Sequence, residues 1–289
     1  MPGYLPPYKS FCSRFEKPIT QENDPAAVRR LNQLTGPFIL RRMKSEVLKE
    51  LPPKTENVYR IELEEEQRKL YLAAVVDARE KLRAAKPEDK MAVFAVLMRL
   101  REICCDPRLI ADNWTGGSAK LDACIELVTS AVEGGHRILL FSQFTSMLEL
   151  LAKRLDAEGV SHFTLQGSTP KPVRAELVRR FNGGEASVFL ISLRAGGTGL
   201  NLTAADIVIH YDPWWNVAAQ NQATDRAYRI GQQNPVQVYK LIAQDTIEEK
   251  IVELQQAKQD LAETVTGSAD GAILRMKPEE LLNLLEGTE

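Results

Sequence analysis

Two arginines, Arg226 and Arg229, stand three residues apart in the stretch DRAYRIGQ. We predict that they end a short helix that begins near Asn216, which would place both on one helix face. A guanidinium group is always charged and forks onto phosphate oxygens, so such a pair can stabilise charge that develops during phosphoryl transfer. Asp225 can orient one of the two. On spacing alone, a surface ion pair with Asp225 worth at most about 1 kcal/mol is the more ordinary interpretation, but the neighbouring loops reverse that preference.

A glycine-rich stretch, RAGGTGLNL at residues 194–202, is the second candidate for chemistry. The backbone amides of Gly196, Gly197 and Gly199 carry no side-chain obstruction, so they can approach a phosphate closely. The third glycine of a dinucleotide fingerprint is missing, because Leu-Asn-Leu follows Gly199. A glycine cluster taken alone is more commonly a tight structural turn.

The motifs that hold a nucleoside triphosphate are absent from the sequence. There is no G-x-x-x-x-G-K-[ST] loop and no acidic magnesium-binding run after a strand. We therefore expect the chain to complete a nucleotide site whose other half lies elsewhere.

Two adjacent tryptophans, Trp214 and Trp215, follow Asp212-Pro213. Packing in the core is the ordinary role for at least one of them. Adjacent residues of an extended loop point in opposite directions, so we expect the other to be exposed, where it can lie against a nucleic-acid backbone or sugar.

The elements that position these residues begin near Ser118. Short apolar runs alternate with amphipathic helices, which predicts an α/β fold with a parallel sheet of at least four strands covered on both faces. Ligands bind at the carboxyl ends of such strands. The loop SQF at 142–144, the glycine-rich stretch and YDPWWN at 211–216 should therefore lie on one edge.

Segments on either side of the sheet read mainly as helices. We expect residues 1–112 to form a mostly helical linker region, in which TENVYRIEL at 55–63 has the alternation of a strand. Residues 113–245 form the α/β lobe and residues 246–289 a set of brace helices. We expect Ser118 and Thr169 to cap helices, and Thr246 to form a capping box with Glu249.

The composition excludes several classes of protein. The 289 residues are 44% hydrophobic and 26% charged, as in soluble globular domains, and no apolar run approaches the roughly 20 residues that span a bilayer. Four cysteines without a C-x-x-C pair and three scattered histidines give no zinc pattern, which favours buried free thiols. The net charge of −2 is not that of a globally basic nucleic-acid binder. Residues 28–54 are locally basic, which fits a solvated helix face and a phosphate-facing patch equally well.

The motifs ILLFSQF, LQGSTP, SLRAGGTGLNLTAAD, YDPWWN and QATDRAYRIGQ, in this order and spacing, resemble the second motor lobe of Swi/Snf-like ATPases. These are DNA translocases of the superfamily-two helicase class. The resemblance extends upstream through FEKPI, GPFILRRMKSEV, LRLREICCDPRLI and SAKL, and downstream through TIEEKI, so it covers nearly the whole chain.

The resemblance implies a RecA-like fold and a set of functional residues. Arg226 and Arg229 would be arginine fingers, which makes the chain part of a DNA-dependent ATPase. The residues that would bind nucleotide are Gln222, Gly197 and Asp225. The residues that would contact DNA are Gly167, Ser168, Thr169, Thr198, Arg194 and Trp215.

The resemblance also implies partners. ATP and Mg²⁺ would bind in the complete motor, and none would be held by this chain alone, because the first RecA-like lobe is missing from it. Double-stranded DNA and that first lobe are the expected partners of a monomer with no membrane contact. We expect a cytoplasmic or nucleoid location in a prokaryote and a nuclear one in a eukaryote, no secretion, and an internal or engineered start at Met1.

The sequence departs from the family pattern at three positions. Asp106 replaces a usual histidine before Pro107, Val217 a usual proline, and Tyr228 a frequent histidine between the arginines. Two other functions remain open. One is a stand-alone DNA- or protein-binding module without hydrolysis. A weaker one is an unrelated nucleotide-sugar or dinucleotide enzyme, for which the third glycine and an acid–base pair are missing.

Overall fold

The computed structural model describes residues 5–20, 24–38, 51–86, 89–193, 195, 199–264 and 277–286, without the side chains of residue 20, residues 257–264 and residue 286. The chain divides into two compact units. One consists of Met1–Glu50 and Gln259–Ser268, and the other of Leu51–Lys258 and Ala269–Glu289. The sheet lies in the second unit.

The first unit contains short helices. Their bounds are α1 Tyr8–Phe11, a π-helical turn Cys12–Glu16, α2 Lys17–Thr20, α3 Pro25–Thr35 and a 3₁₀ turn Gly36–Phe38. The carboxylate of Asp24 accepts a hydrogen bond from the Ala26 N–H at 2.8 Å, so α3 has a side-chain cap at its start.

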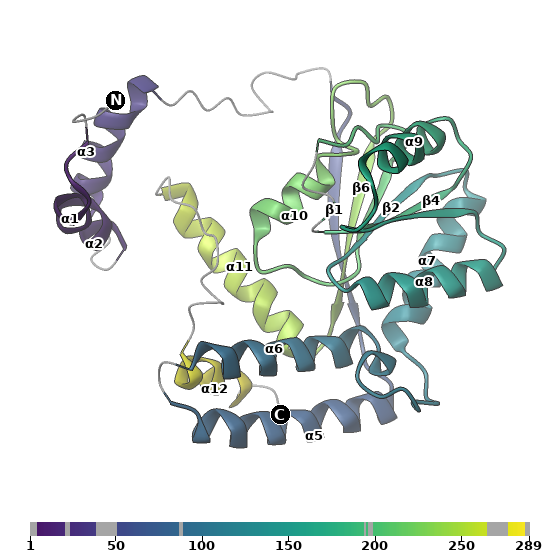
Figure 1. The fold of residues 1–289 in the computed structure, drawn as a ribbon, viewed down its shortest axis with the longest axis horizontal. Coiled ribbons are helices and arrows are strands. Elements are labelled where there is room, and N and C mark those ends of the chain that lie inside the picture. The colour runs from purple at the N-terminus through teal and green to yellow at the C-terminus, as the bar shows by residue number, and fades with distance from the viewer. Residues whose placement is uncertain are drawn as a thin grey trace. The chain divides into compact units, whose positions relative to one another are not determined.

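The second unit is built on a six-stranded sheet in which every pair is parallel, with the order β1-β6-β5-β2-β4-β3 (Figure 1). This confirms the RecA-like α/β prediction. The strands are β1 Lys54–Ile61, β2 Ile138–Ser142, β3 His162–Leu165, β4 Val188–Ser192, β5 Ile207–His210 and β6 Val236–Ala243.

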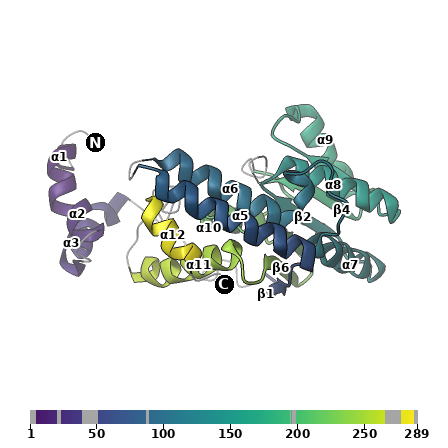
Figure 2. The same ribbon diagram turned by 90° about the horizontal axis from the view of Figure 1, so that it is seen from below.

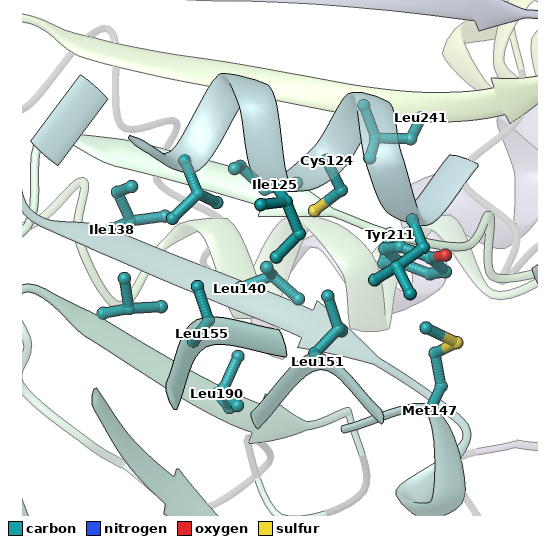
Figure 3. Close-up of a cluster of buried hydrophobic side chains, with 14 of the residues drawn as sticks. Cys124, Ile125, Ile138, Leu140, Met147, Leu151, Leu155, Leu190, Tyr211 and Leu241 are labelled. Carbon is teal, nitrogen blue, oxygen red and sulfur yellow. The ribbon is translucent and has the colours of Figure 1, made fainter. Parts of the chain in front are cut away.

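Helices cover both faces of the sheet, which is why β2, β4 and β5 are apolar at nearly every position and buried throughout. On one face, α7 (Ala119–Glu133) and α8 (Thr145–Ala157) contribute side chains such as Ile125 and Leu151, which pack toward Leu140 and Leu190 (Figure 3). On the other face, α9 (Lys171–Asn182) and α10 (Val217–Thr224) contribute Phe181 and Ala223.

A second core lies among four further helices. These are α5 Glu65–Ala84, α6 Lys90–Cys105, α11 Ile247–Thr264 and α12 Pro278–Glu286, and a 3₁₀ turn, Pro107–Leu109, follows α6. Tyr71, Leu100, Ile251 and Leu281 from these helices belong to one buried cluster, and Figure 2 shows α5, α6 and α12 side by side. The cluster also contains Trp215, so it extends to a loop of the sheet.

The edge strand β1 joins the sheet from a part of the chain that we assigned to the linker. It pairs in parallel with β6, from Lys54 opposite Val236 to Ile61 opposite Ala243. The compact unit therefore begins at Leu51. The two compact units do not coincide with the three expected segments. The segment boundaries after residues 112 and 245 therefore stay a prediction.

Ser118 stands at the predicted N-cap position of α7 but does not cap it with its side chain, and the predicted cap at Thr169 is wrong. The Ser118 hydroxyl donates to the Cys105 carbonyl at 3.1 Å and makes no cap hydrogen bond to α7. The Thr169 hydroxyl accepts from the Gln166 N–H at 3.0 Å, and α9 begins two residues later. In both cases the hydroxyl forms its hydrogen bond with a backbone group that lies outside the helix.

The predicted capping box at Thr246 forms only in part. The Thr246 hydroxyl accepts from the Glu248 N–H at 3.2 Å and donates to the Ala243 carbonyl at 2.7 Å. The Glu249 carboxylate accepts from the Asp245 N–H at 3.0 Å, one residue before the position that a capping box requires.

The cysteines are free, as predicted, and Cys104, Cys105 and Cys124 are buried. Burial raises the pKa of Cys124 to about 12. Within the described ranges, no cluster of three or more His, Cys, Asp or Glu is placed to hold a metal ion. Over the same ranges, no helix has both the length and the apolar character that crossing a bilayer requires.

Candidate functional site

The carboxyl ends of β2, β4 and β5 lie next to one another in the sheet. Ser142 at the end of β2 is opposite Ser192 at the end of β4, and Phe141 is opposite His210 at the end of β5. The predicted arrangement, in which the loops after these strands leave one edge, is therefore confirmed.

Asp212 joins two of these loops. Its carboxylate, which is fully buried, accepts from the Ser142 hydroxyl at 2.6 Å, the Gln143 N–H at 3.2 Å and Nη2 of Arg101 at 3.1 Å. Burial raises the pKa of Asp212, and the Arg101 charge and the Ser142 hydrogen bond offset this only in part. The loops after β2 and β5 are thus fastened together by one buried side chain.

The tryptophan loop packs inward. Trp215 is only 8% exposed, and its ring centroid lies 4.5 Å from the Arg101 guanidinium carbon and 5.2 Å from the Trp214 ring. Trp214 is half-buried, and its backbone N–H donates to the Gln220 side-chain oxygen at 3.2 Å. The expectation that one indole is exposed is wrong, because the loop turns immediately into α10, where the Asn216 side chain caps the Ala219 N–H at 2.8 Å.

The loop after β3 contains three predicted phosphate contacts. Gly167 and Ser168 are exposed and Thr169 is half-buried. Arg174, in the first turn of α9, donates to the Thr169 carbonyl at 3.5 Å and to the Ala195 carbonyl at 3.2 Å, which brings this loop beside the glycine-rich stretch. The predicted site residues Arg194, Gly197 and Thr198 lie outside the described residues.

The helix that precedes the two arginines is shorter than predicted. It ends at Thr224, with Asp225 as its C-cap, so Arg226 and Arg229 lie in the turns that follow and do not share a helix face. A bond from the Leu202 N–H to the Arg226 carbonyl, at 3.0 Å, fastens these turns to the chain that leads into β5. Gln222 remains on the exposed side of α10.

Gln232 fixes the far end of the arginine turns. It is 6% exposed, and its Nε2 donates to the Ala205 carbonyl at 2.7 Å and to the Ala227 carbonyl at 3.1 Å. Gly231 has φ 101°, a conformation that favours glycine. In the sequence, Gly231-Gln232 marks the end of this segment, but nothing local indicates that the Gln232 side chain binds the Ala205 and Ala227 carbonyls.

The arginine turns run along one face of the sheet toward the amino ends of the strands. Thr224, before them, contacts His210 at the end of β5, whereas the Tyr228 ring centroid lies 5.9 Å from Lys54 Nζ at the start of β1. The backbone that carries the two arginines therefore runs away from the carboxyl edge, at which the loops after β2, β4 and β5 begin.

Arg226 carries a poorly compensated charge. It is 7% exposed, and its Nε makes no hydrogen bond to any residue that the structure describes. Burial lowers the pKa of Arg226, and the neighbouring charge of Arg229 lowers it further, whereas Asp225 acts in the opposite direction. Arg229 is exposed. A bound anion would relieve this accumulation of positive charge.

Lys120 and Glu248 form a fully buried ion pair that sequence reasoning missed. The pair joins the first turn of α7 to the first turn of α11. Lys120 Nζ also lies 5.6 Å from the Tyr211 ring centroid, and the Glu248 carboxylate accepts from the Ala243 N–H at 2.9 Å. The two residues are 128 positions apart, so no local pattern reports their contact.

His210 at the end of β5 is buried in its neutral form. Its Nε2 lies 2.9 Å from the Thr224 hydroxyl, and its ring stacks on Phe141. Burial lowers the pKa of His210 to about 3, and Lys240 and Lys54 contribute in the same direction while Glu56 opposes them.

This shift predicts a pH dependence of stability. The pKa is lower in the folded protein than the ordinary value near 6.5, so stability is fully present above about pH 6.5 and falls as the pH drops toward 3. We expect His210 to account for a loss of about 2 kcal/mol between pH 8 and pH 5. Urea unfolding at both pH values should show a shallower pH dependence in His210→Asn. His162→Asn serves as control, and equal slopes in wild type and His210→Asn would contradict the prediction.

Two family models match adjacent parts of the chain. The model described as the SNF2-related domain matches residues 1–109, and the model described as the helicase conserved C-terminal domain matches residues 119–231. The second match includes both arginines and all three loops of the carboxyl edge.

Curated relatives give the same result. A putative ATP-dependent helicase/translocase of Bacillus subtilis is 39% identical over 291 residues, which cover 98% of this chain and 32% of the relative. An uncharacterized ATP-dependent helicase of Mycoplasma genitalium is 37% identical over 290 residues, which cover 99% of this chain and 27% of the relative. The chain thus spans a third or less of the length of these relatives.

A solved structure extends the similarity to three dimensions. The Sulfolobus solfataricus SWI2/SNF2 ATPase core in complex with dsDNA matches with a TM-score of 0.67 and 31% identity, covering 99% of this chain and 61% of that one.

Proposed function

The chain belongs to the SNF2-related family of ATP-dependent helicases, and from this premise we propose that it is the second motor lobe of an ATP-driven translocase on double-stranded DNA. The observation that supports this most strongly is the charge at Arg226. A buried guanidinium with an open Nε, next to an exposed Arg229, suits a phosphate that arrives from outside the chain.

In this proposal Arg226 and Arg229 act as arginine fingers. They neutralise the charge that develops on the γ-phosphoryl group as it leaves ATP, which is the main source of catalysis in phosphoryl transfer. Gln222 and Asp225, at the end of α10, lie close to them in sequence and complete the nucleotide contact together with Gly197. Gln232 holds the turns that carry the arginines.

ATP and Mg²⁺ fit the residues present only in part, because the described residues offer guanidinium groups for phosphate and no cluster of metal ligands. When bound, the nucleotide with its metal supplies the phosphoryl group that is transferred. We propose that a first lobe holds the Mg²⁺ and the remaining phosphates, since the sequence has no G-x-x-x-x-G-K-[ST] loop.

The carboxyl edge of the sheet is the proposed DNA surface. Gly167, Ser168 and Thr169 would bind backbone phosphates together with Arg194 and Thr198 of the adjacent stretch. Such contacts are independent of DNA sequence and sensitive to salt. Trp215 would contribute the edge of its indole, because only 8% of its surface is exposed.

The first lobe and DNA are the proposed partners of a motor that works as a monomer. Each round of nucleotide binding and release would move the DNA-gripping surfaces of the two lobes relative to each other by one step. We propose the cytoplasm or nucleoid as the location in a prokaryote and the nucleus in a eukaryote.

We expect this chain by itself to hydrolyse ATP no faster than a buffer control, with or without duplex DNA, because it supplies only half of the nucleotide contacts. Addition of a first lobe in the same polypeptide should produce DNA-stimulated hydrolysis. A malachite-green phosphate assay measures both. DNA-stimulated turnover by the chain alone would contradict the prediction if it also disappeared in a preparation of Arg226→Ala/Arg229→Ala made in parallel, which excludes a contaminant.

A stand-alone binding module is the second candidate. The observation that favours it is that the sheet and its covering helices form one compact unit, which can fold without a partner lobe. This candidate predicts that no Gly-Lys-Thr loop or acidic magnesium box is encoded upstream in the native reading frame, and that the chain alone binds a fluorescent DNA duplex in an anisotropy titration.

A further inference from the structure

Arg101 is a fully buried arginine whose contacts lie in loops of the sheet rather than in its own helix. It belongs to α6, yet its Nη2 donates to the Asp212 carboxylate at 3.1 Å and to the Pro213 carbonyl at 2.6 Å. Arg101 and Asp212 are 111 positions apart. One side chain of the helical region therefore binds Asp212 and Pro213, the two residues that precede Trp214 in the tryptophan loop.

The remaining environment of Arg101 is aromatic. Its guanidinium carbon lies 4.5 Å from the Trp215 ring centroid and 5.5 Å from that of Phe144. Phe144 is the residue immediately before α8, at the end of the loop after β2. Nε and Nη1 have no hydrogen-bond partner in the described part of the chain. The charge is thus compensated by one carboxylate and by two ring faces, an arrangement that depends on the rings staying in place.

A residue that only filled space would not need this charge. Burying an arginine is expensive, and an apolar side chain of similar volume often packs as well or better. The planar fork is what allows Arg101 to bind Asp212 and Pro213 and to stack on Trp215 at the same time. Asp212 in turn holds Ser142 and the Gln143 N–H.

We propose that Arg101 is a positioning residue that sets the conformation of the tryptophan loop, and that it thereby couples the α5–α6 hairpin to the DNA-facing edge of the sheet. The coupling to DNA rests on the proposed function, whereas the positioning of the loop does not. A displacement of α6, which packs with α5, α11 and α12 in one cluster, would move Arg101 and with it the loop.

The first test measures the loop without DNA or ATP. The chain has three tryptophans, so Trp114→Phe leaves Trp214 and Trp215 as the only fluorophores of their kind. In this background Arg101→Lys, which keeps the charge but loses the fork and the stacking, should raise acrylamide quenching of the loop about twofold or more. Arg99→Lys, an exposed arginine of the same helix, should leave it unchanged. Equal quenching in both variants overturns the positioning role.

The second test uses the intact two-lobe motor. Arg101→Lys should raise the DNA concentration for half-maximal ATPase stimulation about tenfold, while kcat at saturating DNA stays within about twofold of wild type. A merely destabilising change would lower kcat by reducing the amount of folded enzyme and leave the DNA concentration unchanged. Increased quenching without a shift in DNA dependence overturns the coupling to DNA. If the wild-type motor itself lacks DNA stimulation, the proposed function fails, and the quenching test still decides the positioning role.

Discussion

Arg226→Ala and Arg229→Ala should each lower the kcat of DNA-stimulated ATP hydrolysis by about 10³-fold or more in the two-lobe motor. The reason is electrostatic, since each guanidinium is proposed to neutralise charge that is present in the transition state and weaker in the ground state. A 10³-fold loss corresponds to about 4 kcal/mol of transition-state stabilisation. Steady-state kinetics at saturating DNA and ATP measure it directly.

Stability measurements separate this role from a structural one. Arg226 is 7% exposed with an open Nε, so the loss of a poorly compensated charge should offset part of the packing lost in Arg226→Ala, and enough folded protein should remain to measure kcat. Arg154→Ala, an exposed arginine with ion-pair distances of 3.5 and 3.4 Å, is the control and should not change kcat. Unchanged kcat in both Arg226→Ala and Arg229→Ala would remove the finger assignment.

Arg226→Lys tests the fork itself. A lysine keeps the charge but binds phosphate as a point charge on a flexible stem, so only a small part of the lost rate should return. The double variant Arg226→Ala/Arg229→Ala should be little worse than either single one, because residues that act on the same phosphate are strongly non-additive.

The sheet could be predicted from the sequence because its signal is local. Strands such as VFLIS are buried on both faces and therefore apolar at nearly every position, and the helices between them carry apolar stripes. The edge strand β1 is exposed at every position but Ile61, so its membership in the sheet depends on pairing with β6 and not on a burial pattern.

The ends of helices were harder to predict because distant groups determine them. The sequence after α10 has helical character as far as Arg229, but the Leu202 N–H and the Gln232 side chain bind its backbone and draw it into turns. Serine is a residue type that commonly caps helices, yet the Ser118 hydroxyl donates its hydrogen bond to the Cys105 carbonyl. Local propensity gives way to tertiary contact in each case.

The residues that connect the loops and helices around the site could not be predicted from the sequence, because their partners are also distant along the chain. The proposed arginine fingers and the proposed DNA-contacting loops have motif spacing, whereas Arg101 and Lys120 look like ordinary helix residues in LRLRE and SAKL. Their roles follow only from the partners Asp212 and Glu248, which the fold brings to them across more than a hundred positions.

Lys120→Met and Glu248→Gln should each destabilise the chain by about 3–5 kcal/mol, because each leaves its partner as an uncompensated charge in a fully buried site. Lys81→Met, which breaks the exposed i,i+4 pair with Asp77, is the matched control and should change the free energy of unfolding by at most about 0.5 kcal/mol. Urea titrations followed by circular dichroism give all three values.

The double variant Lys120→Met/Glu248→Leu distinguishes a buried charge from lost packing. With both charges gone, the Ala243 N–H and the Cys105 thiol lose their acceptor but no uncompensated charge of this pair remains, so the double variant should be more stable than either single one. If the losses in the free energy of unfolding of the two single variants simply add in the double variant, the pair contributes through packing. That result would contradict the electrostatic argument.

The pH dependence of this pair should be opposite in sign to that of His210. Burial is the largest single influence and would by itself lower the pKa of Lys120, but the charge and hydrogen bond of Glu248, together with smaller contributions from Cys105 and Cys104, raise the pKa above its ordinary value. A raised pKa gives stability that is fully present below about pH 10 and is lost only as the pH rises through the folded-state value. Between pH 6.5 and pH 9 the Lys120→Met deficit should therefore be constant. A deficit that shrinks as the pH falls within this range would mean that the lysine is neutral in the folded protein.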